Sequence, residues 1–120
     1  MTEVIADELP AEVLVPGGQL HRRVRAILTE DGIAVYQEAQ PGGPIELVFR
    51  SRLVTNPADI ARPDPRAPRR RRAYKFETDH GPVVMNAVAG CLCIFPALRG
   101  HTLDSLRDAV RVGSIKTTAV

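Results

Sequence analysis

The chain has 120 residues, which is enough for one domain with a single core and too few for two. Hydrophobic residues make up 44% and charged residues 25%, a globular composition that excludes a disordered chain. No apolar run approaches the roughly 20 residues that cross a bilayer. The acidic start "MTEVIADELP" also lacks the basic region of a signal peptide. We therefore expect no membrane association and a cytoplasmic location, or a virion location if a phage encodes the chain.

The net charge of +2 is unevenly distributed along the chain. Residues 1–20 carry four acids and no base, whereas residues 61–75 carry seven bases and one acid. We interpret residues 1–11 as an acidic N-terminal arm and residues 54–72 as a long loop rich in proline and arginine. The two segments have complementary charge, so they can meet within one chain or between neighbouring copies.

The first half of the chain predicts strands joined by short turns. The segment "AEVLVPGGQL" predicts a short strand that ends at Val15, before the turn at Pro16-Gly17-Gly18. Apolar residues then alternate with arginines over 20–30, the period of a half-buried strand. Tight turns at 30–32 and 39–44 lead to strands over 33–38 and 45–49. These three strands predict an antiparallel meander in which Ile45, Leu47 and Phe49 share one face.

The second half begins with the proline-rich loop, which includes a single helical turn at 57–61. Strands over 73–78 and 83–88 flank a turn, and the apolar run 91–95 predicts a buried strand. A helix over 103–112 follows, with Thr102 as its cap and Gly113 as its stop. Residues 113–120 read as a C-terminal tail.

These elements predict a mainly β fold. Six or seven strands with one C-terminal helix indicate a small antiparallel barrel or sandwich over residues 12–112, with the element order of pleckstrin-homology-like barrels. Such an analogy of fold does not fix the function. The predicted core consists of Val24, Ala26, Leu28, Ile33, Val35, Ile45, Leu47, Phe49, Phe76, Val83, Leu92, Ile94, Leu103, Leu106 and Val110.

Cys91 and Cys93 form the sharpest local motif, "AGCLCIFPALRG". Alternate positions of a strand send both thiols to one face, where His101 is the nearest further candidate ligand for a metal. Structural zinc sites need four ligands, and no second cysteine pair is present. A disulfide is disfavoured by a separation of about 6.6 Å along the strand. We therefore expect two buried thiols, no metal and no cofactor.

The same segment resembles a G-C-x-C run followed by Leu-Arg in small proteins of actinobacteria and their phages. The resemblance covers about a dozen residues and implies no activity. No dinucleotide-binding, Walker-type, nucleophile-elbow or HExxH motif is present. A Cys–His pair using His101 has no orienting acid, so we expect that the chain is not an enzyme.

The arginine-rich loop is the best functional candidate. Arginine pairs bidentately with phosphate and with carboxylate, and Tyr74 and Phe76 alternate on one face where bases can stack. However, a chain with so few aromatic residues needs both rings for its core. The candidate contact residues are Arg62, Arg66, Arg69, Arg70, Arg71, Arg72, Tyr74 and Lys75.

Two functions follow from this loop. The first is a non-catalytic structural or protein-interaction module that binds a protein partner or further copies of itself. Nearly all basic residues are arginine, which indicates a GC-rich genome, so we expect a phage virion or an actinobacterial assembly. The alternative is a nucleic-acid-binding protein that grips phosphates with the same loop.

Overall fold

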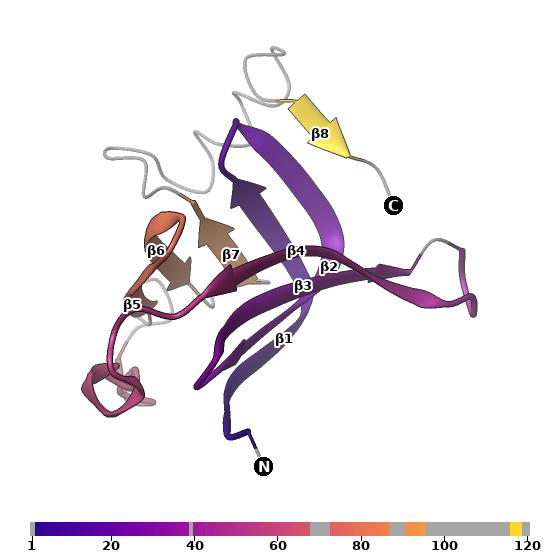
Figure 1. Cartoon of the computed structure of the whole chain (residues 1–120). Helices are drawn as coiled ribbons and strands as arrows, with labels where there is room; N and C mark the ends of the chain where they lie inside the picture. The colour runs from indigo at the N-terminus through magenta and orange to yellow at the C-terminus, as the bar shows by residue number, and fades with distance from the viewer. Residues whose placement is uncertain (1, 39, 68–72, 87–90, 96–115, 119–120) are drawn as a thin grey trace.

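The computed structural model of the chain describes residues 2–38, 40–67, 73–86, 91–95 and 116–118 (Figure 1). Within these residues the chain is mainly β, as the sequence predicts. A single 3-10 turn, η1, lies among them at Pro57–Asp59, inside the segment predicted to form a helical turn. The strands are β1 (Val4–Val15), β2 (Gln19–Thr29), β3 (Gly32–Glu38), β4 (Ile45–Arg52), β5 (Ala73–Thr78), β6 (Gly81–Asn86), β7 (Cys91–Ile94) and β8 (Lys116–Thr118).

The strands form one mixed sheet. In the described ranges its order is β4-β3-β2-β1-β7-β6-β5, and β8 pairs with β2 beside this path. The predicted meander is confirmed, because β2, β3 and β4 pair antiparallel in sequence order. The prediction of a wholly antiparallel sheet is wrong, because β7 pairs in parallel with β1 and β8 pairs in parallel with β2.

The sheet is open, so the predicted small barrel or sandwich is corrected to one open sheet. Its edge strands β4 and β5 meet at an isolated bridge between Leu53 and Thr78, beside a hydrogen bond of 3.0 Å from Asp79 N to Arg52 O. Beyond Leu53 the chain enters the proline-rich segment, and proline has no N–H for a strand ladder. The predicted helix over 103–112 lies outside the described residues.

Strand β1 lies in the middle of the sheet, between β2 and β7. It includes most of residues 1–11, which the sequence suggests as a separate acidic arm. Ile5, Ala6 and Ala11 are buried in the core, while the acidic Asp7 on the same strand is exposed. The acidic segment is therefore part of the sheet, because apolar residues that lie between its charged residues pack into the core.

The predicted core is largely confirmed. The buried members of the predicted set lie on β2, β3, β5, β6 and β7, and Phe49 on β4 is partly buried against them. Leu103, Leu106 and Val110 lie outside the described residues. The confirmed core residues are Val24, Ala26, Leu28, Ile33, Val35, Phe76, Val83, Leu92 and Ile94.

Ile45 and Leu47 are exposed, at 63% and 49%, and their prediction as core residues is wrong. The cause is a β-bulge in β4. Val35 pairs with Phe49, whereas the next residue, Tyr36, pairs with Leu47, so β4 contains one extra residue. An extra residue moves the side chains beyond it to the other face of the strand.

The face that results is called here the outer face of the hairpin. It is the side of β3 and β4 that is turned away from the buried Ile33 and Val35. Paired residues of an antiparallel ladder share a face and alternate residues share a side. From the tip of the hairpin to its base, the pairs on the outer face are Glu38–Ile45, Tyr36–Leu47, Ala34–Arg50 and Gly32–Arg52.

The tip of this hairpin extends beyond β2. The ladder between β2 and β3 runs from the pair Arg25–Tyr36 to the pair Thr29–Gly32. The β3–β4 ladder continues past Tyr36 to the pair Glu38–Ile45. In Figure 1 the hairpin accordingly extends to one side of the sheet as a two-stranded ribbon. Ile45 and Leu47 are exposed because they lie on this ribbon and face outward.

Candidate functional site

The arginine-rich loop contacts the start of the chain through Arg62. Its guanidinium donates to Ile5 O at 3.1 Å and to Glu3 Oε1 at 2.9 Å. The predicted meeting of acidic and basic segments thus occurs within one chain at this pair, although both side chains are more than half exposed. Arg66 is exposed, and Arg69, Arg70, Arg71 and Arg72 lie outside the described residues.

Tyr74 and Lys75 lie on β5, directly after the loop. Tyr74 and Phe76 share one face, as alternation predicts, and Phe76 is buried while Tyr74 packs partly buried against the core. Lys75 lies on the opposite face and is exposed. The two rings therefore serve the core and form no open stacking surface. Of the predicted contact residues in the described part of the chain, Arg66 and Lys75 are exposed and form no ion pair with other described residues.

Cys91 and Cys93 are buried in β7, with their sulfur atoms 3.8 Å apart. The hydrogen bond between the thiols, together with burial, raises the pKa of Cys93 well above its usual value. A thiol must lose its proton before it binds a metal or attacks an electrophile. His101 lies outside the described residues, and within them no three ligand-type side chains cluster around one point.

We expect both thiols to be inert in the folded protein. A disulfide-exchange reagent should modify fewer than about one in ten thiols at neutral pH in the time that modifies both in denaturant, because both thiols are buried and the pKa of Cys93 is raised. The measurement is the absorbance of the released thiolate with and without urea. Rapid stoichiometric modification of the native protein would contradict this reading of β7.

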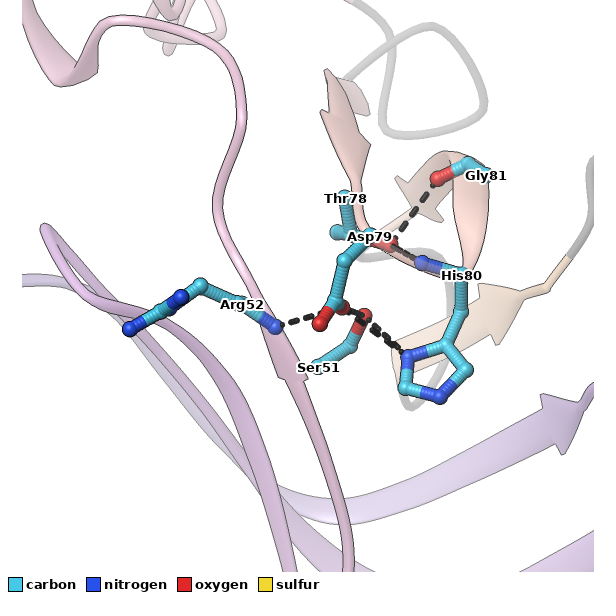
Figure 2. Close-up of polar contacts among 6 residues, drawn as sticks. All are labelled: Ser51, Arg52, Thr78, Asp79, His80 and Gly81. Atoms are coloured by element: carbon cyan, nitrogen blue, oxygen red, sulfur yellow. Dashed lines mark hydrogen bonds and ion pairs between the residues drawn. The ribbon is translucent and has the colours of Figure 1, made fainter.

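A polar cluster that the sequence did not predict joins the end of β4 to the β5–β6 turn (Figure 2). Ser51 Oγ donates to Asp79 Oδ1 at 2.9 Å and lies 2.8 Å from His80 Nδ1. The same Asp79 oxygen accepts from Arg52 N at 2.9 Å and lies 3.0 Å from His80 Nδ1. Hydrogen bonds from Ser51 and from the Arg52 N–H lower the pKa of Asp79.

This cluster contains the residue types of a serine hydrolase but not its geometry. In such a triad the histidine ring stands between serine and aspartate and uses a different nitrogen for each. Here Ser51 binds the aspartate directly, and both groups lie at the same ring nitrogen, Nδ1. Ser51 is also only 1% exposed, so its hydroxyl is closed to a substrate.

The cluster fixes the β5–β6 turn against β4. Thr78 Oγ1 donates to Gly81 O at 2.9 Å and accepts from His80 N at 3.1 Å, which closes the turn. The His80 ring packs against Phe49 at a centroid distance of 5.1 Å. These contacts tie the two edges of the open sheet together at one corner, and we interpret the cluster as structural.

A groove lies beside this cluster at the base of the outer face, with a volume of about 590 Å³. The side chain of Ala34 on β3 is small, and Arg50 and Arg52 flank the groove from β4. Within the described residues neither guanidinium has an ion-pair partner. The residues that line the groove are Thr29, Asp31, Gly32, Ile33, Ala34, Arg50, Ser51, Arg52 and Asp79.

Comparisons with family models, curated proteins and solved structures give no match to this chain. Across the described ranges, no helix has the length and apolar character needed to span a membrane. The function is therefore inferred from the surface of the chain itself, above all from the outer face of the hairpin.

Proposed function

We propose that this chain is a non-catalytic protein-interaction module that associates with further copies of itself through the outer face of the β3–β4 hairpin. The observation that carries the proposal is the exposure of Ile45 and Leu47 side by side at the hairpin tip. Complete burial of one such side chain contributes about 1.5–3 kcal/mol. These side chains stay exposed when one chain folds, so their burial can stabilise an interface with a partner.

A second copy is the partner that this face fits. The tip of the face carries Ile45, Leu47 and the acidic Glu38. The opposite end carries the groove and the basic Arg50. An interface between identical patches must be complementary to itself. The acid Glu38 at one end of the face and the cation Arg50 toward the other end meet that requirement.

We place the module in a larger assembly, a phage virion or an actinobacterial complex, for which the arginine-rich composition is the support. We also retain the pleckstrin-homology-like order as a proposal. Its support is that β1–β4 and β5–β7 are two runs of sequential antiparallel strands. In such an assembly the exposed Arg66 and Lys75 are a second contact region for carboxylates.

Nucleic-acid binding through the arginine-rich loop is the second proposal. It is favoured by the exposure of Arg66 and Lys75 on either side of residues 69–72. Two observations weigh against it: Arg62 is engaged with Glu3, and Tyr74 packs against the core. We therefore rank it below self-association.

Light scattering after size exclusion, over a concentration series and a salt series, tests the first proposal. The wild type should exceed the mass of one chain as concentration rises, and Leu47→Asp should remain a monomer because a carboxylate cannot be buried there unpaired. Leu9→Asp is the matched control, since Leu9 is 67% exposed on β1, and it should behave as the wild type.

A wild type that stays monomeric at every concentration would remove the proposal. The nucleic-acid alternative makes a different forecast for the same proteins. Duplex affinity would then fall with salt at a log–log slope of roughly −0.9 per phosphate contact. That binding would survive Leu47→Asp and disappear when Arg69, Arg70, Arg71 and Arg72 are all replaced by Ala.

A further inference from the structure

We infer that two copies pack their hairpins antiparallel about a two-fold axis, so that the tip of each lies in the groove of the other and Glu38 of each pairs with Arg50 of its partner. The inference rests on the proposed function and specifies its geometry. It follows from the order of residues along the outer face, from their charges and from the condition of the strand edge.

The order of residues along the face is symmetric in position about the pair Tyr36–Leu47. The tip pair Glu38–Ile45 lies two residues from it on β3, and the pair Ala34–Arg50 lies two residues away in the other direction. Each step is about 6.6 Å at the usual rise of a strand. A two-fold axis beside Tyr36 and Leu47 therefore brings each tip over the other chain's Ala34 and Arg50.

The charges select this antiparallel arrangement. Arg50 has no ion-pair partner within the described residues. Glu38 uses Oε1 to accept from Gly42 N at 2.9 Å, which leaves Oε2 for a partner. In the parallel alternative, like charges would face each other at both ends of the hairpin, which is unfavourable.

The two acids of the groove are already hydrogen-bonded inside the chain. Asp79 accepts from Ser51 and from Arg52 N, and Asp31 accepts from Thr2 Oγ1 at 3.2 Å. Asp31 and Asp79 lie beside the cross-strand pair Gly32–Arg52, at the end of the hairpin away from the tip, and not beside the pair Ala34–Arg50. Arg25, which is paired with Tyr36 on the same face, is held in an ion pair by Asp7. Arg50 is therefore the cation in the pair that the partner's tip covers, Ala34–Arg50.

A partner can pack on the outer face of β4 more readily than it can pair with the edge of this strand. The backbone N–H and C=O of Arg52 are taken up by Asp79, and the bulge at Val48 distorts the ladder further along. Bulges and charged side chains are the devices that prevent edge-to-edge pairing. Continuation of the sheet into a second chain through β4 is therefore disfavoured.

Charge reversal tests the arrangement. Glu38→Arg and Arg50→Glu, each alone, should weaken the dimer about ten-fold or more, since each reversal places like charges at two symmetric contacts. An equimolar mixture of the two variants should restore dimerisation to near the wild-type level, because both contacts then join opposite charges on different chains. Glu38→Gln, which keeps the acceptor for Gly42 N–H, should weaken the dimer less than Glu38→Arg.

Sedimentation equilibrium gives the dimer dissociation constants, and circular dichroism verifies that each variant is folded. A wild-type dimer that Leu47→Asp disrupts but that neither reversal weakens would overturn this arrangement and leave the proposed function standing. Weakening by each reversal without recovery in the mixture would also overturn it. A monomeric wild type would remove the proposed function and this inference together.

Discussion

Replacing Phe95 with Ala should lower the free energy of unfolding by about 3–5 kcal/mol, the range for large aromatic truncations in a core. Phe95 is among the largest fully buried side chains in the described part of the chain. Its ring meets Phe49 edge to face at 5.2 Å, and its backbone N–H donates to Leu14 O at 2.7 Å. The side chain therefore lies where β7, β1 and β4 converge, and its loss leaves a cavity among all three.

Urea unfolding followed by circular dichroism measures this loss. The control is Leu9→Ala, which removes an exposed aliphatic side chain and should change stability by less than about 0.5 kcal/mol. A loss below about 1 kcal/mol for Phe95→Ala would mean that the Phe95 ring is not packed among β7, β1 and β4.

Gly32→Ala should be comparably damaging, at about 3–5 kcal/mol, the upper range for a single substitution. Gly32 has a φ of +144°, which side chains rarely adopt, and an added Cβ would overlap the backbone oxygen of Ser51. Leu53 N lies 2.9 Å from the same position. Because these obstacles are backbone atoms of the adjacent strand end, relief requires β4 to separate from β3.

Gly18→Ala is the matched control for this substitution. Gly18 also has a positive φ, of +80°, but an added Cβ would meet nothing within 4 Å. Its cost should be limited to the backbone conformation, about 1–2 kcal/mol. Equal losses of thermal and urea stability in the two variants would contradict the close approach of β4 to Gly32.

Local alternation in the sequence was sufficient to predict the meander of β2, β3 and β4. The same alternation gives the wrong face for Leu47. Ile45, Leu47 and Phe49 alternate regularly in the sequence, whereas the bulge at Val48 arises from the pairing of β4 with β3. Nothing in "IELVF" marks the extra residue. The exposed face was therefore hidden by an apparently regular pattern.

The candidate site was harder to predict than the fold. Ser51 and His80 are 29 residues apart, and a β5–β6 turn at 79–80 was expected without any partner for its side chains. The central position of β1 was also missed, because its parallel pairing with β7 depends on tertiary structure rather than on local pattern. The sequence did indicate charge complementarity, which the Glu3–Arg62 pair realises.

The central position of β1 has a consequence for the synthesis of the protein. One edge of β1 pairs with β2 as soon as that strand emerges, but the other edge waits for β7, where Cys91 pairs with Ala11. At about 5–20 residues per second, the intervening chain takes on the order of ten seconds to translate. During this interval an apolar strand edge stands open on the nascent chain, and non-local parallel pairing is slow even when β7 arrives. Ribosome-bound chains that end before Cys91 are thus the forms of this protein most exposed to aggregation.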